Sequence, residues 1–346
     1  MKKRIVFISC LLLTIVFITS CATSVVTQYM VPAKYDMSSY RNLAILTPSA
    51  YRLRAYDLPS PIVRDMSGTS PVRVYSGFNV NSERIMNEYL NSKVVEKGEK
   101  STYFTITLPS VADTYKERFS LMADRGIEAV LYISTEDIDI DEFIFAKEIK
   151  TIEPPVNPGD DPQEVTTLVY YLEQSVSVAF AWEVKSTGNG VILARDSYTD
   201  MKSETTKIDI DKSSSMFAPR IQGIMNEIAS DFSSTIFEQL EPTIKTKHIS
   251  LMKNNPKSDR VEEAYNIVKD GNLVIGLQIF EKEWKRNDHI PSVYNAALIL
   301  EALDQRDNAI ELLVKAYKES GNTKVRKLLD AMRERSSLTE QAESQL

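Results

Sequence analysis

The sequence predicts an α/β (α+β) protein, with a mixed sheet and flanking helices, followed by a small all-α helical-repeat domain. Between residues 43 and 240, short apolar runs with the two-residue period of strands alternate with segments that have the period of amphipathic helices. After residue 258, apolar side chains recur at helical spacing and the pattern repeats. The composition fits a globular chain, since 43% of the 346 residues are hydrophobic and 26% are charged.

The first twenty residues have the layout of a secretory signal peptide. Lys2, Lys3 and Arg4 precede an apolar run, which ends in small residues at position 20. The run is about 14 to 16 residues long, whereas a transmembrane helix needs roughly 20. We therefore expect residues 1–20 to be removed rather than kept as a membrane-spanning anchor.

The segment Ile18-Thr19-Ser20-Cys21 resembles the lipobox of bacterial lipoproteins. The resemblance implies that Cys21 is lipidated, with acyl chains such as palmitate, and becomes the new N-terminus. Ala22, in place of aspartate, implies sorting to the outer membrane. Plain secretion is the alternative. Because Cys10 would leave with the signal peptide, the mature chain would have neither a disulfide nor a free thiol.

We expect a lipidated N-terminus and tether at 21–36, and then an α/β domain at 37–245. A long loop at 49–80, with aromatic residues, is a possible contact surface. The acidic alternation at 136–141 is typical of a strand with one face in solvent. The expected strands are 43–46, 103–108, 127–133 and a hairpin of 175–185 with 191–199; the expected helices are 82–96, 114–125 and 215–240.

A linker at 246–257 is expected to lead to tetratricopeptide-like repeats at 258–335 and a polar tail at 336–346, with Arg335 facing solvent. Two units align at an offset of 33 residues, against about 34 for a tetratricopeptide repeat: Gly271, Gly276 and Phe280 with Asp304, Ala309 and Leu313. The residues predicted to pack the groove between the helices are Tyr294, Asn295, Ala297, Ala309, Leu313 and Ala316. Such repeats either bind a protein partner on a concave surface or simply cap the α/β domain.

Catalytic and metal-binding motifs are absent from the sequence. It has no G-x-S-x-G, HExxH, P-loop or G-x-G-x-x-G pattern, and its two histidines are His248 and His289. The acidic run at 136–142 lacks the spacing of an EF-hand. Loss of three basic residues with the signal peptide takes the net charge from −7 to −10, which argues against nucleic-acid binding. We predict a protein without enzymatic activity, cofactor or metal.

The segment from Pro32 to Leu46 (PAKYDMSSYRNLAIL) resembles the opening of envelope lipoproteins related to the curli-secretion channel subunit and the penicillin-binding-protein activators. The order of elements over residues 30–245 is also similar. The resemblance implies a non-catalytic module that works through protein contacts in the envelope. Two features depart from the family pattern. Thr47-Pro48 stands where Pro-Phe is usual, and the 49–80 loop is long.

These observations predict a lipid-anchored outer-membrane protein that acts as a protein-binding or scaffolding module. The α/β domain is expected near the lipid, with the repeats reaching out to a partner. One alternative is a subunit of an oligomeric envelope secretion channel. A second is an envelope hydrolase that uses two carboxylates, for which the sequence indicates no particular pair. The sequence leaves open the oligomeric state and which side of the membrane the protein faces.

Overall fold

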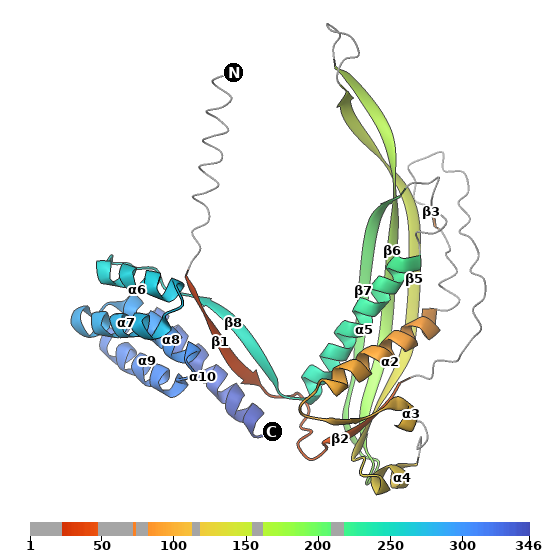
Figure 1. The fold of residues 1–346 in the computed structure, drawn as a ribbon, viewed down its shortest axis with the longest axis horizontal. Coiled ribbons are helices and arrows are strands. Elements are labelled where there is room, and N and C mark those ends of the chain that lie inside the picture. The colour runs from red at the N-terminus through yellow and green to blue at the C-terminus, as the bar shows by residue number, and fades with distance from the viewer. Residues whose placement is uncertain (1–22, 48–71, 74–81, 113–117, 154–161, 209–217) are drawn as a thin grey trace. The chain divides into compact units, whose positions relative to one another are not determined.

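The computed structural model describes residues 23–47, 72–73, 82–112, 118–153, 162–208 and 218–346 (Figure 1). The chain divides into two compact units. One unit is Ala33–Glu241, here called the α/β unit. The other, here called the helical unit, joins Pro242–Leu346 to the segment before Ala33.

The α/β unit is built on a six-stranded mixed sheet, as the sequence predicts. β2 is parallel to β4 and β5, while β5, β6 and β7 are antiparallel neighbours and β3 pairs with β5. The strand order is β4-β2-β5-β6-β7. The strands are β2 (Asn42–Leu46), β3 (Val72–Arg73), β4 (Thr105–Thr107), β5 (Ala129–Glu153), β6 (Gln163–Ser186) and β7 (Ile192–Ile208).

Helices cover both faces of this sheet near β2. Leu43 and Ile45 point to the core formed with α2 (Ser82–Glu99) and α5 (Ala218–Leu240). Ala44 and Leu46 point the other way, to α3 (Pro109–Ala112) and α4 (Phe119–Asp124). The larger core contains Phe180, Trp182 and Phe232, all at most 2% exposed. The apolar periods of α2 and α5 supply the faces that bury this side of the sheet.

The long antiparallel pairing of β5 with β6 extends beyond the predicted strands. The pairing runs from Ala129, opposite Ser186, to Glu153, opposite Gln163. A bulge between Thr135 and Asp137 shifts the alternation by one residue, so that buried Ile133 and Ile140 both face the helices. The acidic alternation therefore does lie on a strand. The sequence did not predict where this strand ends, because the bulge interrupts the two-residue alternation of its inward-facing positions.

In its described residues, from 23 to 32 and from 242 to 346, the helical unit contains five helices, each packed on the next, and a two-stranded sheet. The helices are α6 (Asp259–Lys269), α7 (Leu273–Asn287), α8 (Ile290–Ala302), α9 (Arg306–Ser320) and α10 (Thr323–Glu343). β1 (Ser24–Val31) pairs with β8 (Thr243–Ser250) in antiparallel register along its full length.

The left-handed backbone positions at the helix ends repeat with the predicted offset of 33 residues. Gly271 has φ of 89° and Asp304 has φ of 59°, in the turns before α7 and α9. Asp288 has φ of 48° and Gly321 has φ of 62°, at the ends of those two helices. The same turn geometry thus recurs one repeat later, which supports the predicted alignment of the two units.

Four expected segments are corrected. The expected tether at 21–36 contains β1, and the expected linker at 246–257 begins with the last residues of β8. The expected tail at 336–346 largely continues α10, in which Ala342 is fully buried. β1 and β8 pair across more than 200 residues, and such a pairing leaves no signal within either segment alone. The α/β unit ends at Glu241 rather than at 245.

Gly276 allows α6 and α7 to approach closely. A Cβ at this position would lie 2.3 Å from Cγ2 of Val268. Gly276→Ala is therefore expected to destabilise the helical unit by about 1–3 kcal/mol through overpacking. Urea unfolding measures this change.

Adding Val268→Ala should restore most of the stability that Gly276→Ala removes, because it deletes the clashing methyl groups. Gly223→Ala is the matched control, since exposed Gly223 on α5 has no atom within 4 Å of an added Cβ. That change should stabilise by about 0.5–1 kcal/mol through helix propensity. A destabilisation by Gly276→Ala that persists in the Val268→Ala background would contradict this packing account.

Candidate functional site

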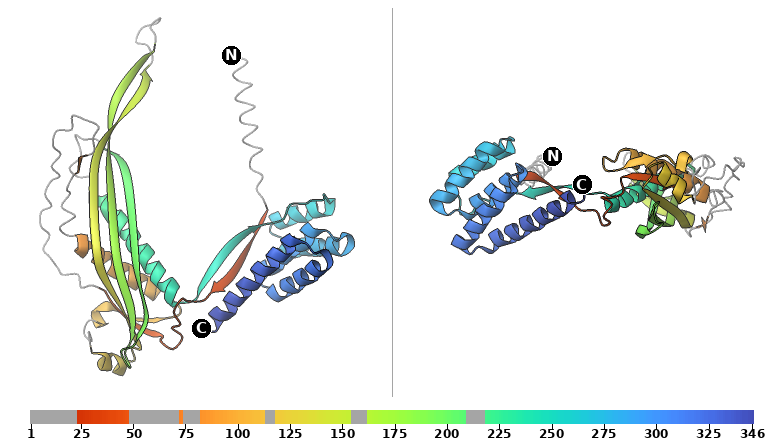
Figure 2. Two further views of the ribbon diagram at one scale, coloured as in Figure 1. Left: turned by 180° about the vertical axis from the view of Figure 1, so that it is seen from behind. Right: turned by 90° about the horizontal axis from the view of Figure 1, so that it is seen from below.

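The candidate site is the surface of the helical unit that holds β1. β1 lies against α8 and α10 (Figure 2). Val25 and Thr27 on β1 are only 2% and 1% exposed, and Val25 belongs to the same core as the helices. The face of the repeats formed by α8 and α10 is therefore covered here by the chain's own strand.

The edge of β1 that faces away from β8 is held by side chains of the helices. Nη2 of Arg306 donates to the carbonyl oxygen of Gln28 at 2.5 Å. The backbone N–H of Met30 donates to Oγ1 of Thr339 at 3.3 Å, and Thr339 also accepts from Nη1 of Arg306. These contacts satisfy backbone groups that would otherwise form an open sheet edge.

Asn295 binds the backbone just after β8 through both ends of its amide. Its Oδ1 accepts from the N–H of Met252 at 2.6 Å, and its Nδ2 donates to the carbonyl oxygen of Met252 at 3.0 Å. Nδ2 also donates to Oη of Tyr265 at 3.0 Å. Burial raises the pKa of Tyr265, while the bond from Asn295 opposes that rise. Asn295 is fully buried, so it fixes one main-chain segment in one position.

Asn295→Leu is expected to destabilise the helical unit by about 1–3 kcal/mol. The leucine leaves the N–H and C=O of Met252 without their partner at a largely buried place. Asn308→Leu, at an exposed position on α9, is the matched control and should change stability by less than about 0.5 kcal/mol. Chemical denaturation of the three proteins measures this, and equal effects at the two positions would refute the role given to Asn295.

A buried ion pair lies below the β1 surface. Nε and Nη2 of Arg335 donate to the two oxygens of Glu301 at 2.6 and 2.8 Å. The depression above it has a volume of about 430 Å³ and is lined by residues of β1, β8, α9 and α10 as well as Glu301. Both oxygens of Glu301 are engaged, so this pair ties α8 to α10. The expectation that Arg335 faces solvent is wrong, because α10 continues past it and buries it.

The structure places the six predicted groove residues in the helical core. Asn295, Ala297, Ala309, Leu313 and Ala316 are buried, and Tyr294 is half-buried with a pKa raised by burial. The sequence did not indicate Met252, Arg306 or Thr339 as parts of the site. Met252 contacts Asn295 through its backbone, and the side chains of Arg306 and Thr339 contact backbone groups of β1. Contacts to backbone groups leave no signature in side-chain periodicity.

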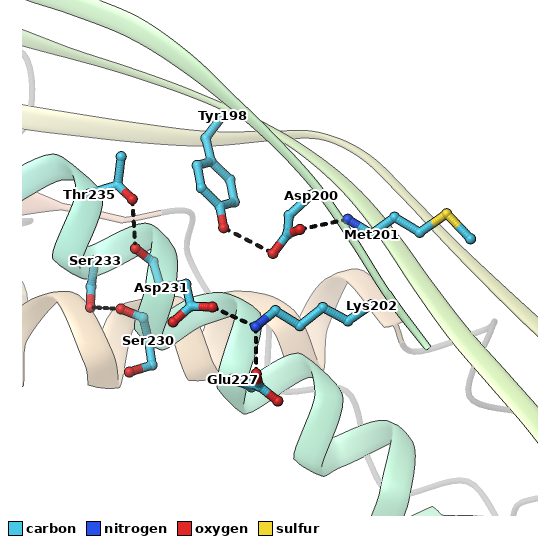
Figure 3. Close-up of polar contacts among 9 residues, drawn as sticks. All are labelled: Tyr198, Asp200, Met201, Lys202, Glu227, Ser230, Asp231, Ser233 and Thr235. Carbon is cyan, nitrogen blue, oxygen red and sulfur yellow. Dashed lines mark hydrogen bonds and ion pairs between the residues drawn. The ribbon is translucent and has the colours of Figure 1, made fainter. Parts of the chain in front are cut away.

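A polar cluster in the α/β unit joins β7 to α5 (Figure 3). Nζ of Lys202 lies 2.6 Å from Oε1 of Glu227 and 2.5 Å from Oδ2 of Asp231, one turn apart on α5. The hydrogen bonds that Lys202 donates to Asp231 and Glu227 raise the pKa of Lys202. Burial raises the pKa of Tyr198, and the hydrogen bond that Tyr198 donates to Asp200 at 3.0 Å raises it further. These ion pairs join β7 to α5.

The histidines and the acidic run, which the sequence analysis considered for catalysis or metal binding, do not form a site in the part of the chain that the structure describes. His248 is exposed on β8, while buried His289 bonds to Ser292 and to the carbonyl oxygen of Pro256. Glu142 of the acidic run accepts from Nε2 of Gln174 at 2.7 Å. Within the described ranges, no three His, Cys, Asp or Glu side chains are grouped to hold a metal ion. Cys21 and the aromatic residues of loop 49–80 lie outside the described residues.

None of the helices in the described part of the chain is long and apolar enough to span a bilayer.

No family model matches the sequence, and no curated protein matches it. Among solved structures, the chain is similar to the PelC dodecamer from Paraburkholderia phytofirmans, with 10% identity and a TM-score of 0.23. The match covers 63% of this chain and 97% of that chain. A likeness at this level does not define a fold family for the chain.

Proposed function

We propose that the chain is a lipid-anchored protein of the bacterial outer membrane that acts as a non-catalytic binding or scaffolding module. The observation that carries the proposal is the position of the lipobox-like Cys21. It lies three residues before β1, which pairs with β8 and is held by Arg306 and Thr339 on its other edge. An acyl group on Cys21 would thus hold a folded unit directly at the membrane.

Several charged groups at well-defined contacts serve the fold, which supports a non-catalytic role. Glu301 binds Arg335, and Lys202 binds two acids of α5. Oε1 of Glu283 accepts from Ser258 at 2.6 Å and from Asn287 at 2.9 Å, and the Ser258 bond is the main cause that lowers the Glu283 pKa. A catalytic acid or base needs one oxygen or nitrogen directed at a substrate. The atoms of these groups that make the contacts named above are directed at neighbouring helices, turns and strands.

The partner surface that we propose is the groove between α7 and α9. The α8 side of the repeats already holds β1 and Met252. The α7–α9 groove has a volume of about 450 Å³, with apolar Leu277, Leu300 and Leu312. Charged residues surround them: Glu281, Lys285, Glu311 and Lys315. An apolar centre with a charged rim is the usual anatomy of a protein–protein interface.

A photo-crosslinking residue at Leu312 tests this surface in the intact envelope. We expect a discrete adduct of one size from position 312, because the groove would be covered by the partner. Lys327, exposed on α10, is the matched control and should give no discrete adduct. Identical crosslinking from both positions would overturn the assignment of the groove.

Size analysis in mild detergent separates this proposal from the channel alternative. A monomer, or the chain with one crosslinked partner, supports a scaffolding module. A large closed homo-oligomer supports the channel subunit instead and removes the main reason for the proposal.

A further inference from the structure

We propose that the end of the helical unit at which β1 begins is the membrane-facing surface of the protein and rests on anionic phospholipid headgroups. The inference rests on the proposed lipid attachment at Cys21. It replaces the expectation that the α/β domain lies nearest the lipid. Three features carry it: the covalent distance from Cys21, the pairing of β1, and the distribution of charge on the helical unit.

The covalent distance is short. The carbonyl oxygen of Thr23 accepts from the N–H of Leu251 at 2.8 Å, so the chain is already part of the fold two residues after Cys21. Two residues span at most about 7 Å even when fully extended. The surface around Leu251 must therefore lie within that reach of the acylated residue.

Three chain segments meet at this end of the helical unit. Residues 252–256, the turn between α7 and α8, and the turn between α9 and α10 line one shallow depression of about 330 Å³. Met252 and Ile290 are half-buried there, and Pro256 is exposed. This surface is here called the anchor end.

β1 cannot act as a spacer that carries the anchor end away from the membrane. Its eight residues, from Ser24 to Val31, are paired with β8. Seven steps along a strand cover about 23 Å. Met30, which meets Thr339 at the opposite end of the helical unit, lies six of these steps from Ser24 and is therefore farther from Cys21 by about 20 Å.

Charge on the turns differs between the two ends. The anchor-end segments 252–259, 285–290 and 321–324 contain five basic residues, Lys253, Lys257, Lys285, Arg286 and Lys324, against the acids Asp259 and Asp288. The opposite segments 269–273, 303–307 and 339–346 contain the acids Asp270, Asp304, Asp307, Glu340 and Glu343, against Lys269 and Arg306. Basic side chains close to a bilayer are attracted to anionic lipids, and acidic ones are repelled. The charge asymmetry therefore favours the orientation that the short covalent distance imposes.

Fluorescence quenching by lipid headgroups tests the orientation in the full-length lipidated protein. Lys253→Cys and Glu343→Cys place one label at each end, and both native residues are exposed. The proteins are reconstituted in vesicles of phosphatidylcholine and phosphatidylglycerol with a headgroup-attached quencher. We expect the label at position 253 to lose most of its fluorescence and the label at position 343 to lose little. Equal quenching, or stronger quenching at position 343, would overturn the inference.

Charge reversal and lipid composition test the headgroup chemistry. Lys253→Glu, Lys257→Glu and Lys324→Glu are combined, with the label moved to Asn255→Cys. We expect quenching to fall in this variant and in vesicles of phosphatidylcholine alone. The matched variant Asp270→Lys with Glu340→Lys should leave the quenching at position 255 unchanged. Quenching that changes neither with charge reversal nor with lipid composition would refute the proposed contact with anionic headgroups.

Mass spectrometry of the same preparations separates the two claims. A lipidated chain with the wrong quenching pattern overturns this inference and leaves the proposed anchoring intact. A chain that carries no lipid overturns both.

Discussion

Arg335→Leu is expected to destabilise the helical unit by about 3–5 kcal/mol, because it leaves a buried carboxylate without its partner. The side chains of Arg335 and Glu301 are 6% and 0% exposed, and two hydrogen bonds join them. Glu301 cannot turn to water without unpacking α8 from α10. Urea unfolding, followed by Trp284 fluorescence in a Trp182→Phe background, measures the effect on this unit.

Two further variants show whether the loss comes from the unpaired charge. Adding Glu301→Leu should recover most of the stability, since two apolar side chains can replace a buried ion pair at little cost. The exposed pair of Arg326 and Asp330, also on α10, is the matched control at 63% and 61% side-chain exposure. Arg326→Leu should cost less than about 0.5 kcal/mol. A double variant as unstable as Arg335→Leu would refute this explanation.

Cys21→Ala is expected to release the protein from the membrane when the first twenty residues are replaced by a signal peptide of an ordinary secreted protein. Two or three acyl chains anchor a protein stably, whereas a single chain binds only marginally and a protein without one has no such anchor. Fractionation of the envelope measures the effect. We expect the natural chain in the membrane pellet and the variant in the soluble fraction.

Cys10→Ala in the natural chain is the matched control for the loss of a thiol. Because Cys10 lies in the segment expected to be removed, this change should leave the protein in the membrane pellet. Membrane attachment of the Cys21→Ala protein that survives high salt would contradict anchoring by lipid and indicate another membrane contact.

The sequence predicts those parts of the fold that have a local pattern. The apolar stripe from Ile221 to Leu240 lies on α5, and the 33-residue alignment recurs in the backbone turns of the helical unit. Small residues in that alignment were informative for a physical reason. A Cβ at Gly276 would clash with Val268, and Ala309 is fully buried.

The parts that escaped prediction depend on contacts between distant residues. β1 and β8 pair although more than 200 residues separate them, and β1 also packs against α8 and α10. The inward position of Arg335 depends on Glu301, which lies 34 residues earlier on another helix. The candidate site was therefore predicted only in the helical residues that pack between the repeats, Asn295 among them. Its main-chain contacts through Asn295, Arg306 and Thr339 follow from the three-dimensional structure alone.

The central claim is that Cys21 joins this chain to the membrane. The most direct test is the mass of the N-terminal peptide of the mature protein, taken from the envelope of cells that express the natural sequence. The account predicts a peptide that begins at Cys21 and carries a diacylglyceryl group on its sulfur. An unmodified Cys21, a start at another residue, or retention of residues 1–20 would contradict it.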